Sequence, residues 1–239
     1  MSVVCVTTSW DDGHICDLRL AALLKKYGAK GTFYIAPRNR EQKPADLLSS
    51  AQIAALATDF EIGAHTLTHP FLTQVTDEVA QQEISGSKQY LEELLQKPVT
   101  SFCYPGGFYT DQHVAFVRQA GFTFARTVKR FALGFGQELL ASPTTFHAYR
   151  HWSDAWQIAK ISHFNPWRYV VYQLQWDKLA IALFERAKAR NGLFHLWGHS
   201  WEIDKNHDWQ RLENVLAYIA KQPDVHYLTN GDIAHAARI

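Results

Sequence analysis

The order of hydrophobic and polar positions along the chain predicts short buried strands that alternate with amphipathic helices. The expected strands are residues 3–9, 31–36, 60–63, 100–103, 122–126, 193–197 and 225–228. The expected helices are residues 16–27, 50–58, 76–96, 111–120, 176–190, 209–221 and 231–237. Ser50 and Thr76 are the expected N-caps of two of these helices, because their hydroxyls can accept hydrogen bonds from the first turn.

This alternation predicts an α/β fold with a parallel sheet and crossover helices. Seven expected strands without a clear domain break favour a closed or nearly closed β/α barrel over an open sheet, with residues 1–239 as a single domain. In such barrels the chemistry lies at the carboxyl ends of the strands, so we expect functional residues directly after strands. Residues 127–150 show no clear period and are expected to be irregular.

Composition places the chain among ordinary globular proteins. Hydrophobic residues make up 47% and charged residues 20%, which excludes disordered and collagen-like chains. The net charge of +1 gives no sign of a nucleic-acid partner, and no apolar run approaches the roughly 18 residues of a membrane span. The first residues lack the pattern of a signal peptide, so we expect a cytoplasmic protein with three reduced cysteines. The sequence does not indicate an oligomeric state.

Two adjacent carboxylates, Asp11 and Asp12, follow the first expected strand. Like charges this close raise each other's pKa, so the pair indicates a nearby positive charge. A divalent cation could bind one carboxylate and leave the other as a base. The alternative is structural, with one Asp capping the helix that begins near residue 16.

His65 and His69 follow the third expected strand. Pro70 disfavours helical geometry at His69, so the pair is expected on a loop or a single turn. One carboxylate and two imidazoles form a three-point site that leaves positions open for water and substrate. The acidic pair and the two histidines together therefore predict a catalytic metal centre. Zinc is the first choice on ligand type, and iron, cobalt and manganese also suit this ligand set.

Two later segments also follow expected strands. The corner at Pro105 and Gly106 is either a tight turn or an oxyanion hole built from a backbone N–H group. His195 and His199 share one face of the late strand, and His199 lies nearer the end where the chemistry is expected. Glu202 could orient one of these histidines.

These four segments, in this order, resemble the NodB-homology polysaccharide deacetylases, carbohydrate esterase family 4. The segments are WDDG at residues 10–13, HTLTHP at 65–70, CYPGG at 103–107 and WGH at 197–199. The resemblance implies a distorted (β/α)7 barrel. It also implies a metal-dependent hydrolase that removes N-acetyl groups from an amino-sugar-containing glycan or glycoconjugate.

The resemblance also implies roles for individual residues. The expected roles are Asp11 as general base, Asp12, His65 and His69 as metal ligands, the backbone N–H near Gly106 as oxyanion donor, and His199 as general acid with His195 as the alternative. The expected substrate-binding residues are Tyr104, Pro105, Arg126 and Trp197. Residues 127–175 are expected to form the rim of the cleft, and the tryptophans at 152, 156, 167, 197 and 201 could stack on sugar rings.

The chain departs from the family pattern at two motifs. Cys103 stands where the third motif has Arg, Gly106 stands where it has Tyr, and the Asp/Trp fourth motif is not found. Arg126, at the end of the next expected strand, could supply the missing cation. Two other functions stay open: hydrolysis of a different non-peptide C–N bond, as in allantoinase-like and cyclic imide hydrolases, and non-catalytic carbohydrate binding.

Overall fold

The structure is a computed structural model that describes residues 3–236. Its centre is a parallel sheet in the order β5-β4-β3-β2-β1-β7-β6, with β8 paired to β1. Within the described residues the strands are β1 (Val4–Asp11), β2 (Thr32–Ile35), β3 (Glu61–Ala64), β4 (Ser101–Cys103), β5 (Phe124–Arg126), β6 (Phe146–His147), β7 (Leu193–Gly198) and β8 (Val225–Tyr227).

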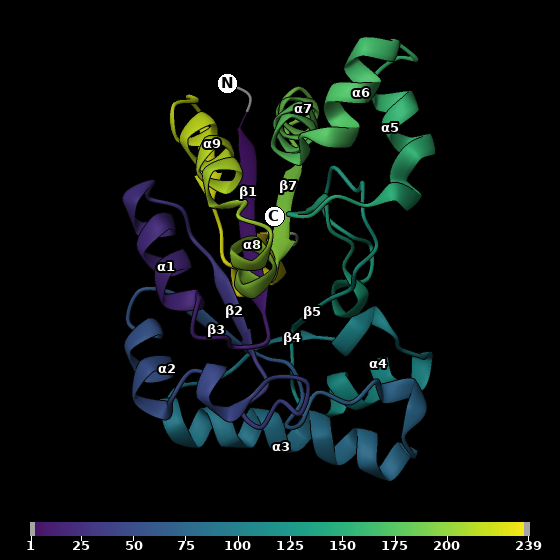
Figure 1. The fold of residues 1–239 in the computed structure, drawn as a ribbon. Helices are drawn as coiled ribbons and strands as arrows, with labels where there is room; N and C mark the ends of the chain where they lie inside the picture. Colours follow the sequence, from purple (N-terminus) through teal and green to yellow (C-terminus); the bar gives the residue numbers. More distant parts are fainter. Residues whose placement is uncertain (1–2, 237–239) are drawn as a thin grey trace.

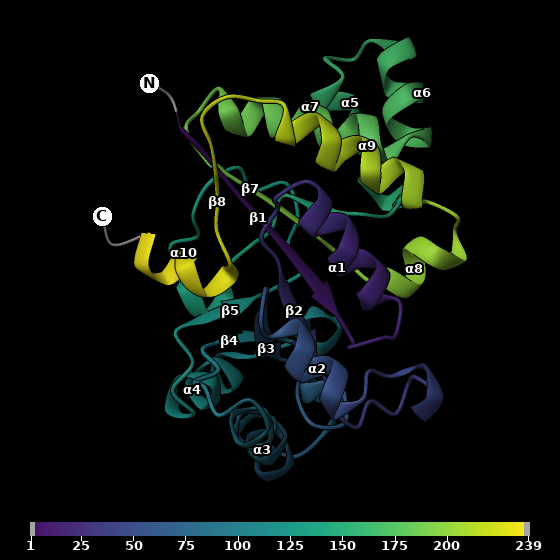
Figure 2. The same cartoon turned by 90° about the vertical axis from the view of Figure 1, so that its left-hand side faces the viewer.

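Helices cover the outside of this sheet (Figures 1 and 2). They are α1 (Asp17–Lys26), α2 (Ser50–Leu56), α3 (Asp77–Leu95), α4 (Asp111–Gln119), α5 (Ala155–Ile161), α6 (Pro166–Leu174), α7 (Trp176–Lys188), α8 (Ser200–Lys205), α9 (Trp209–Ala220) and α10 (Asn230–Ala236). Helix α3 contacts β3 and α4, while α7 contacts α9, β1 and β7. None of the described helices is long and apolar enough to cross a membrane.

The sheet curls until its two edges nearly meet. Strand β1 pairs with β2 at its carboxyl end, through residues 9–11, and with β8 at its amino end, through residues 4–6. At the far edge, Ser142 forms a β-bridge with Arg126 of β5, and β6 a few residues later pairs with β7. Residues 142–147 thus connect β5 to β7. The expected distorted (β/α)7 barrel is confirmed, with β8 as an extra short strand.

The sequence pattern located most of the strands and helices and missed four of them. Every expected strand and helix is present within a few residues, although residue 237 of the last expected helix lies outside the described part. Thr76 caps α3 as expected, but the cap of α2 is Ser49, one residue before the expected Ser50. Ser49 and Gln52 form a capping box, which satisfies two backbone N–H groups at once. Strand β6 and helices α5, α6 and α8 had not been expected.

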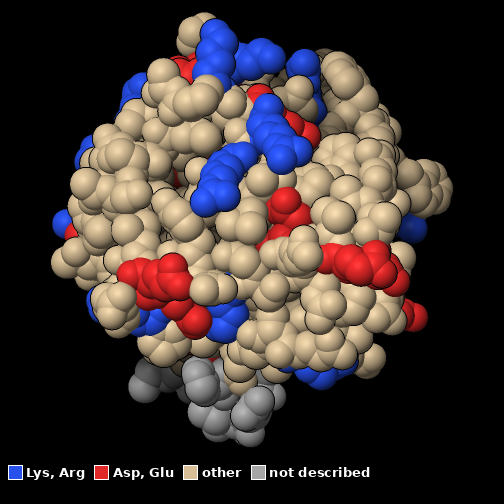
Figure 3. All heavy atoms as spheres, turned by 90° about the horizontal axis from the view of Figure 1, so that it is seen from below, with Lys and Arg blue, Asp and Glu red and all other residues tan. Residues whose placement is uncertain are grey.

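Charged side chains of both signs lie on one face of the molecule. On the face seen from below in Figure 1, groups of Lys and Arg lie beside groups of Asp and Glu, and uncharged side chains cover most of the area (Figure 3). Neither sign dominates this face, in keeping with the net charge of +1. A polyanion binding surface would instead concentrate basic residues on one side.

Candidate active site

Because all the strands are parallel, their carboxyl ends lie at one end of the barrel. The residues at or just after these ends include Asp11 and Asp12 (β1), His65 (β3), Cys103 (β4), Arg126 (β5), His147 (β6) and His199 (β7). Most of the residues expected to carry the chemistry therefore converge, although up to 188 positions separate them along the chain.

Three donor atoms face one point in this cluster. The Nε2 atoms of His65 and His69 are 3.2 Å apart, and Asp12 Oδ1 lies 3.9 Å from the first and 3.4 Å from the second. Atoms that ligate one zinc ion at about 2.0–2.2 Å lie roughly 3.0–3.6 Å from one another. The spacing of the three atoms is close to this range.

The surroundings leave these donor atoms free to bind a cation. Asp12 Oδ1 is buried and has no hydrogen-bond partner among the described residues, while Asp12 Oδ2 accepts from Trp201 Nε1 at 2.8 Å. His65 Nδ1 lies 2.7 Å from the carbonyl oxygen of Cys103, so this nitrogen donates and Nε2 carries the lone pair. Burial lowers the pKa of His65 to about 4, which keeps the ring neutral. The three residues fit a divalent metal ion.

The candidate metal ligands lie in segments with an unusual backbone conformation, one after β1 and one in the loop that carries the histidines. Asp12, Thr66 and His69 have φ values of 83°, 64° and 63°, in the left-handed region that non-glycine residues rarely adopt. Such residues cost about 1–3 kcal/mol each and persist only where their surroundings hold them. Thr66 Oγ1 accepts from the backbone N–H of His69 at 3.1 Å, which fixes the loop that brings the two rings together. As expected from Pro70, the pair does not lie on a helix.

Glu83 of α3 anchors the same loop from outside. Its Oε2 accepts from the backbone N–H groups of Leu67 and Thr68, both at 2.8 Å, and its Oε1 accepts from Thr68 Oγ1 at 2.6 Å. Glu83 is buried although it carries a charge, and these three bonds satisfy its carboxylate. On the other side, Glu41 Oε2 lies 3.3 Å from His69 Nδ1, although this nitrogen makes no hydrogen bond within the described residues.

Asp11 has a different partner from Asp12. Both of its carboxylate oxygens accept from Arg126 Nη2, and both side chains are buried. Burial alone would raise the pKa of Asp11, but the charges of Arg126, His65 and His199 hold it well below its ordinary value. Arg126 is packed 4.4 Å from the ring centre of Trp197 and 5.5 Å from that of Tyr34. The cation that the third motif lacks is therefore present, on β5.

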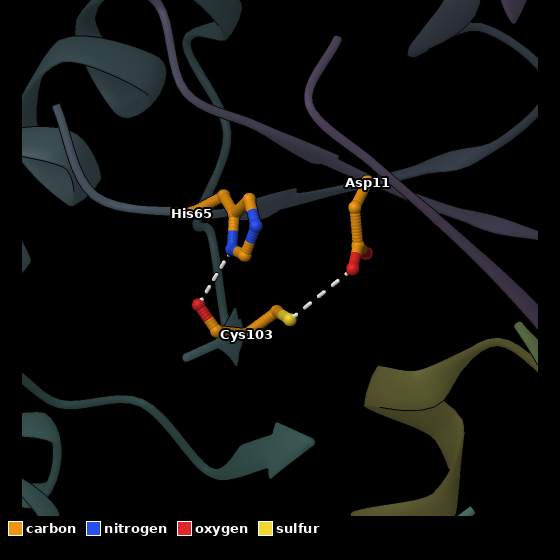
Figure 4. Close-up of side chains that lie close together, drawn as sticks. All are labelled: Asp11, His65 and Cys103. Atoms are coloured by element: carbon orange, nitrogen blue, oxygen red, sulfur yellow. Dashed lines mark hydrogen bonds between the residues drawn. The ribbon is translucent and has the colours of Figure 1, made fainter. Parts of the chain in front are cut away.

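Cys103 lies beside the pair of Asp11 and Arg126. It stands where the third motif of the family has Arg. Its Sγ is 3.7 Å from Asp11 Oδ2, and its carbonyl oxygen meets His65 (Figure 4). Asp11, His65 and Cys103 are close enough to form a second set of metal donors. However, burial raises the pKa of the Cys103 thiol, and only the thiolate is a good ligand. Asp11 is also already paired with Arg126, so the set with Asp12 and His69 is the better fit.

His199 is the histidine at the site, and its Nε2 lies 3.9 Å from Asp11 Oδ2. Its Nδ1 lies 2.5 Å from Glu202 Oε2. Burial alone would lower the pKa of His199, but the bond to Glu202 and the charges of Asp12 and Asp11 raise it to about 9. His195 lies inside β7, four residues earlier, where it is buried and its Nε2 meets Ser9 Oγ at 2.9 Å. The geometry favours His199 over His195 as the acid.

Glu202 also contacts a second histidine. His147 Nε2 lies 3.1 Å from Glu202 Oε2, and His147 Nδ1 lies 2.7 Å from His151 Nε2. Burial lowers the pKa of His147 to about 4, so it is neutral and donates one N–H to Glu202. The His147 ring also stacks on Trp197 at 3.9 Å. A continuous chain of hydrogen bonds therefore runs from His151 through His147 and Glu202 to His199.

The residues expected to bind substrate occupy other positions. Tyr104 is buried, stacks on Tyr109, and donates its hydroxyl hydrogen to the carbonyl of Leu140 at 2.8 Å. Trp197 is buried between Arg126 and His147. Arg126 and Trp197 thus contact other site residues from within the protein. The packing does not favour a direct contact between a sugar and Arg126, Trp197 or Tyr104. Pro105 is also buried.

Gly106 stays the expected oxyanion donor. The carbonyls of Tyr104 and Pro105 accept from Gly107 and Phe108, so these turn bonds do not use the N–H of Gly106. Its φ of 60° is in the left-handed region, and an added Cβ would lie 2.8 Å from Phe71. Glycine is favoured here for both reasons. The loop geometry is compatible with the expected role.

Sequence reasoning missed Glu83, Glu41, His147 and His151. His147 and His151 carried a usable signal, because they repeat the four-residue spacing of His65 and His69. Glu83 carried none, since a charged residue in the middle of an amphipathic helix is ordinarily exposed. Trp201, expected to stack on a sugar, donates to the metal-ligand candidate Asp12 instead.

A family model described as polysaccharide deacetylase matches residues 2–125, just over half of the chain. The chain is 27% identical over 139 residues to YxkH of Bacillus subtilis, covering 57% of this chain and 49% of that protein. It is 27% identical over 100 residues to the peptidoglycan-N-acetylglucosamine deacetylase of Bacillus cereus, covering 42% and 44%. The chain thus spans about half the length of the curated relatives that it matches.

Solved structures agree with this match. The Streptococcus pyogenes deacetylase PplD, solved in complex with acetate, is 25% identical, with a TM-score of 0.53 over 57% of this chain and 62% of that one. A crystal structure from Mycobacterium smegmatis shares the fold over 99% of this chain and 91% of its own, with a TM-score of 0.73 and 14% identity. From its family match and from the convergence of the motif segments at one end of the barrel, the chain belongs to the polysaccharide deacetylase family.

Proposed function

We propose that this protein is a metal-dependent hydrolase that removes N-acetyl groups from an amino-sugar-containing glycan or glycoconjugate. The observation that carries the proposal is the convergence of Asp12, His65 and His69 beside a separate, ionised Asp11. The name of the Bacillus cereus relative supports an N-acetylated sugar as the substrate class. The ligand types favour zinc, with iron, cobalt and manganese as alternatives.

Asp12, His65 and His69 would hold the ion. When bound, such an ion lowers the pKa of a water molecule and polarises the carbonyl that is attacked. Asp11 would act as the general base, because it is ionised and faces the site without ligating. Arg126 keeps this carboxylate charged and fixes its orientation. It also limits the strength of the base, since a low pKa makes a carboxylate a weak proton acceptor.

His199 supplies the second proton transfer. Its imidazolium form is stabilised by Glu202, so it can donate a proton to the amine nitrogen as the C–N bond breaks. The backbone N–H of Gly106 would donate to the developing oxyanion. The balanced reaction adds one water molecule across the amide and releases acetate and a free amino sugar.

The proposal is tested by acetate release from N-acetylated amino-sugar oligomers, measured after chelation and again after addition of zinc, iron, cobalt or manganese. We expect no release after chelation and restored release with at least one metal. Glycan binding without hydrolysis under any metal would instead identify a carbohydrate-binding barrel. Hydrolysis of allantoin or of a cyclic imide in place of the sugar amide would assign the site to a different C–N bond.

A further inference from the structure

Helices α5 and α6 expose an apolar surface that contributes no residue to the candidate metal and acid–base groups. Three of its side chains, Trp152, Trp156 and Trp167, are tryptophans that were expected to stack on sugar rings. Both helices lie at the outer edge of the molecule, beside α7 (Figures 1 and 2). Of the twelve large hydrophobic side chains that are exposed in the described residues, seven belong to residues 152–174. They are Trp152, Trp156, Phe164, Trp167, Val170, Val171 and Leu174. We call these seven side chains the aromatic face.

Helix α6 carries apolar side chains on two sides: Tyr169 and Tyr172 pack against the core, and a second set faces solvent. Trp167, Val170, Val171 and Leu174 are spaced by three and four residues, so they form one stripe, and this stripe faces solvent. Trp167 is 81% exposed, whereas the polar Gln173 of the same helix is buried. A monomeric protein rarely leaves a contiguous apolar patch uncovered unless the patch binds something.

The charged residues within residues 148–175 are almost all basic. Lys160 lies 5.1 Å from the ring centre of Trp156, Arg150 lies 4.8 Å from that of Trp152, and Arg168 is exposed on α6. The single carboxylate in residues 148–175 is Asp154, which is buried and paired with Arg130 at 2.6 Å. This segment therefore combines aromatic and aliphatic side chains with cations. From outside the segment, Asp208 lines a pocket with Arg150 and Leu174, and its charge is paired with Arg211 at 2.9 Å.

We propose that the aromatic face docks the protein on the surface of an anionic lipid bilayer. Tryptophan and phenylalanine favour the boundary between headgroups and acyl chains, and flanking Lys and Arg side chains contact anionic headgroups. The contact is peripheral, because no described helix can span a bilayer. The whole-chain charge of +1 gives no sign of such a partner, since the cations are local to this segment.

The proposed docking surface is close in sequence to the candidate site. Trp152 directly follows His151, which begins the chain of hydrogen bonds that leads through His147 and Glu202 to His199. Docking would therefore hold this side of the active site near the bilayer. The docking proposal does not depend on the proposed hydrolysis and can be tested without substrate.

The test is co-sedimentation of the full chain with vesicles of phosphatidylcholine alone or mixed with phosphatidylglycerol. We expect binding to the mixed vesicles, weaker binding to phosphatidylcholine, and loss of binding at high salt because salt screens the cations. The Trp167→Ser/Val171→Ser variant should bind at least about tenfold more weakly, since two buried apolar side chains are lost. The control, Val79→Ser/Phe135→Ser, changes exposed hydrophobic residues elsewhere and should bind like the wild type.

Several results would overturn the proposal. These are no binding to either vesicle, equal binding to both, or equal loss of binding in the control variant. Sedimentation of the protein without lipid measures its oligomeric state. It tests whether a second copy of the chain covers the aromatic face instead of a bilayer. If the wild type is a dimer and Trp167→Ser/Val171→Ser is a monomer, the aromatic face is a dimer interface and the lipid proposal is wrong.

Discussion

Asp11 and Asp12 are neighbours in the sequence, yet their surroundings give them different chemistry. Asp11 ends β1 inside the barrel, where Arg126 neutralises it. Asp12 follows at a φ of 83°, and its side chain lies toward the imidazoles of His65 and His69. The structure thus resolves the repulsion between adjacent carboxylates in two ways, by an arginine for one and by a candidate metal position for the other.

This division predicts separate effects for two substitutions. Asp11→Asn should keep metal content near the wild-type level and lower kcat by roughly 10²–10⁴-fold, because a general base is lost. His65→Ala should lower the metal content itself. Elemental analysis of the purified proteins and acetate release would show both effects. Near wild-type turnover in Asp11→Asn would contradict the role of Asp11.

The buried pair of Arg126 and Asp11 makes a prediction about stability. Arg126→Met leaves a carboxylate buried without a partner, so unfolding free energy should fall by about 3–5 kcal/mol. Adding Asp11→Asn removes that charge, and the double variant should regain a large part of the loss. Denaturant unfolding of the two single variants and the double variant measures this coupling. Independent, additive effects would show that the two side chains do not form the pair described here.

The pH dependence of the reaction tests whether His199 is the general acid. A group with a raised pKa stays protonated to higher pH, so kcat/KM should fall as the pH rises through about 9, where His199 loses its proton. In Glu202→Gln the supporting charge is gone, and the alkaline limb of the profile should move to lower pH. Asp204→Asn, a change on the same helix α8 outside the chain of hydrogen bonds, is the matched control. An alkaline limb that stays in place in Glu202→Gln would rule out this pair as its origin.

At the level of elements, helix α3 holds the loop of residues 65–70, which carries the two candidate metal-binding histidines. Glu83 binds two backbone N–H groups and one hydroxyl of that loop. We expect Glu83→Gln to weaken metal binding by roughly 10–100-fold, as other losses of outer support do. Competition with a chelator measures the affinity. Glu93→Gln, on the exposed side of the same helix, should leave it unchanged, and equal affinities in the two variants would contradict the supporting role of Glu83.

The elements that sequence reasoning located are those whose own pattern is strong. Helix α3 has 19 residues and a hydroxyl cap, so local signals suffice to place it. Strand β6 has two residues and α8 has six, and both depend on contacts with distant parts of the chain. Helix α6 exposes its apolar stripe, so the usual rule that such a stripe faces the core gives no guide to its environment.

At the level of the whole molecule, the barrel explains why the site could be predicted in outline. Parallel strands place their carboxyl ends together, so residues just after strands could be expected to lie close to one another before any contact was known. The partners across the barrel could not be assigned in the same way. Arg126 is 115 positions from Asp11 in sequence, and its pairing depends on the curl that brings β5 opposite β1.

The decisive measurement is anomalous scattering from crystals of the protein grown with a divalent metal. The proposed function predicts one strong peak bounded by Asp12 Oδ1, His65 Nε2 and His69 Nε2, with Asp11 still paired to Arg126 and outside ligand distance. A peak elsewhere, or an ion-free site in which those three side chains are fully hydrogen-bonded to protein atoms, would contradict it.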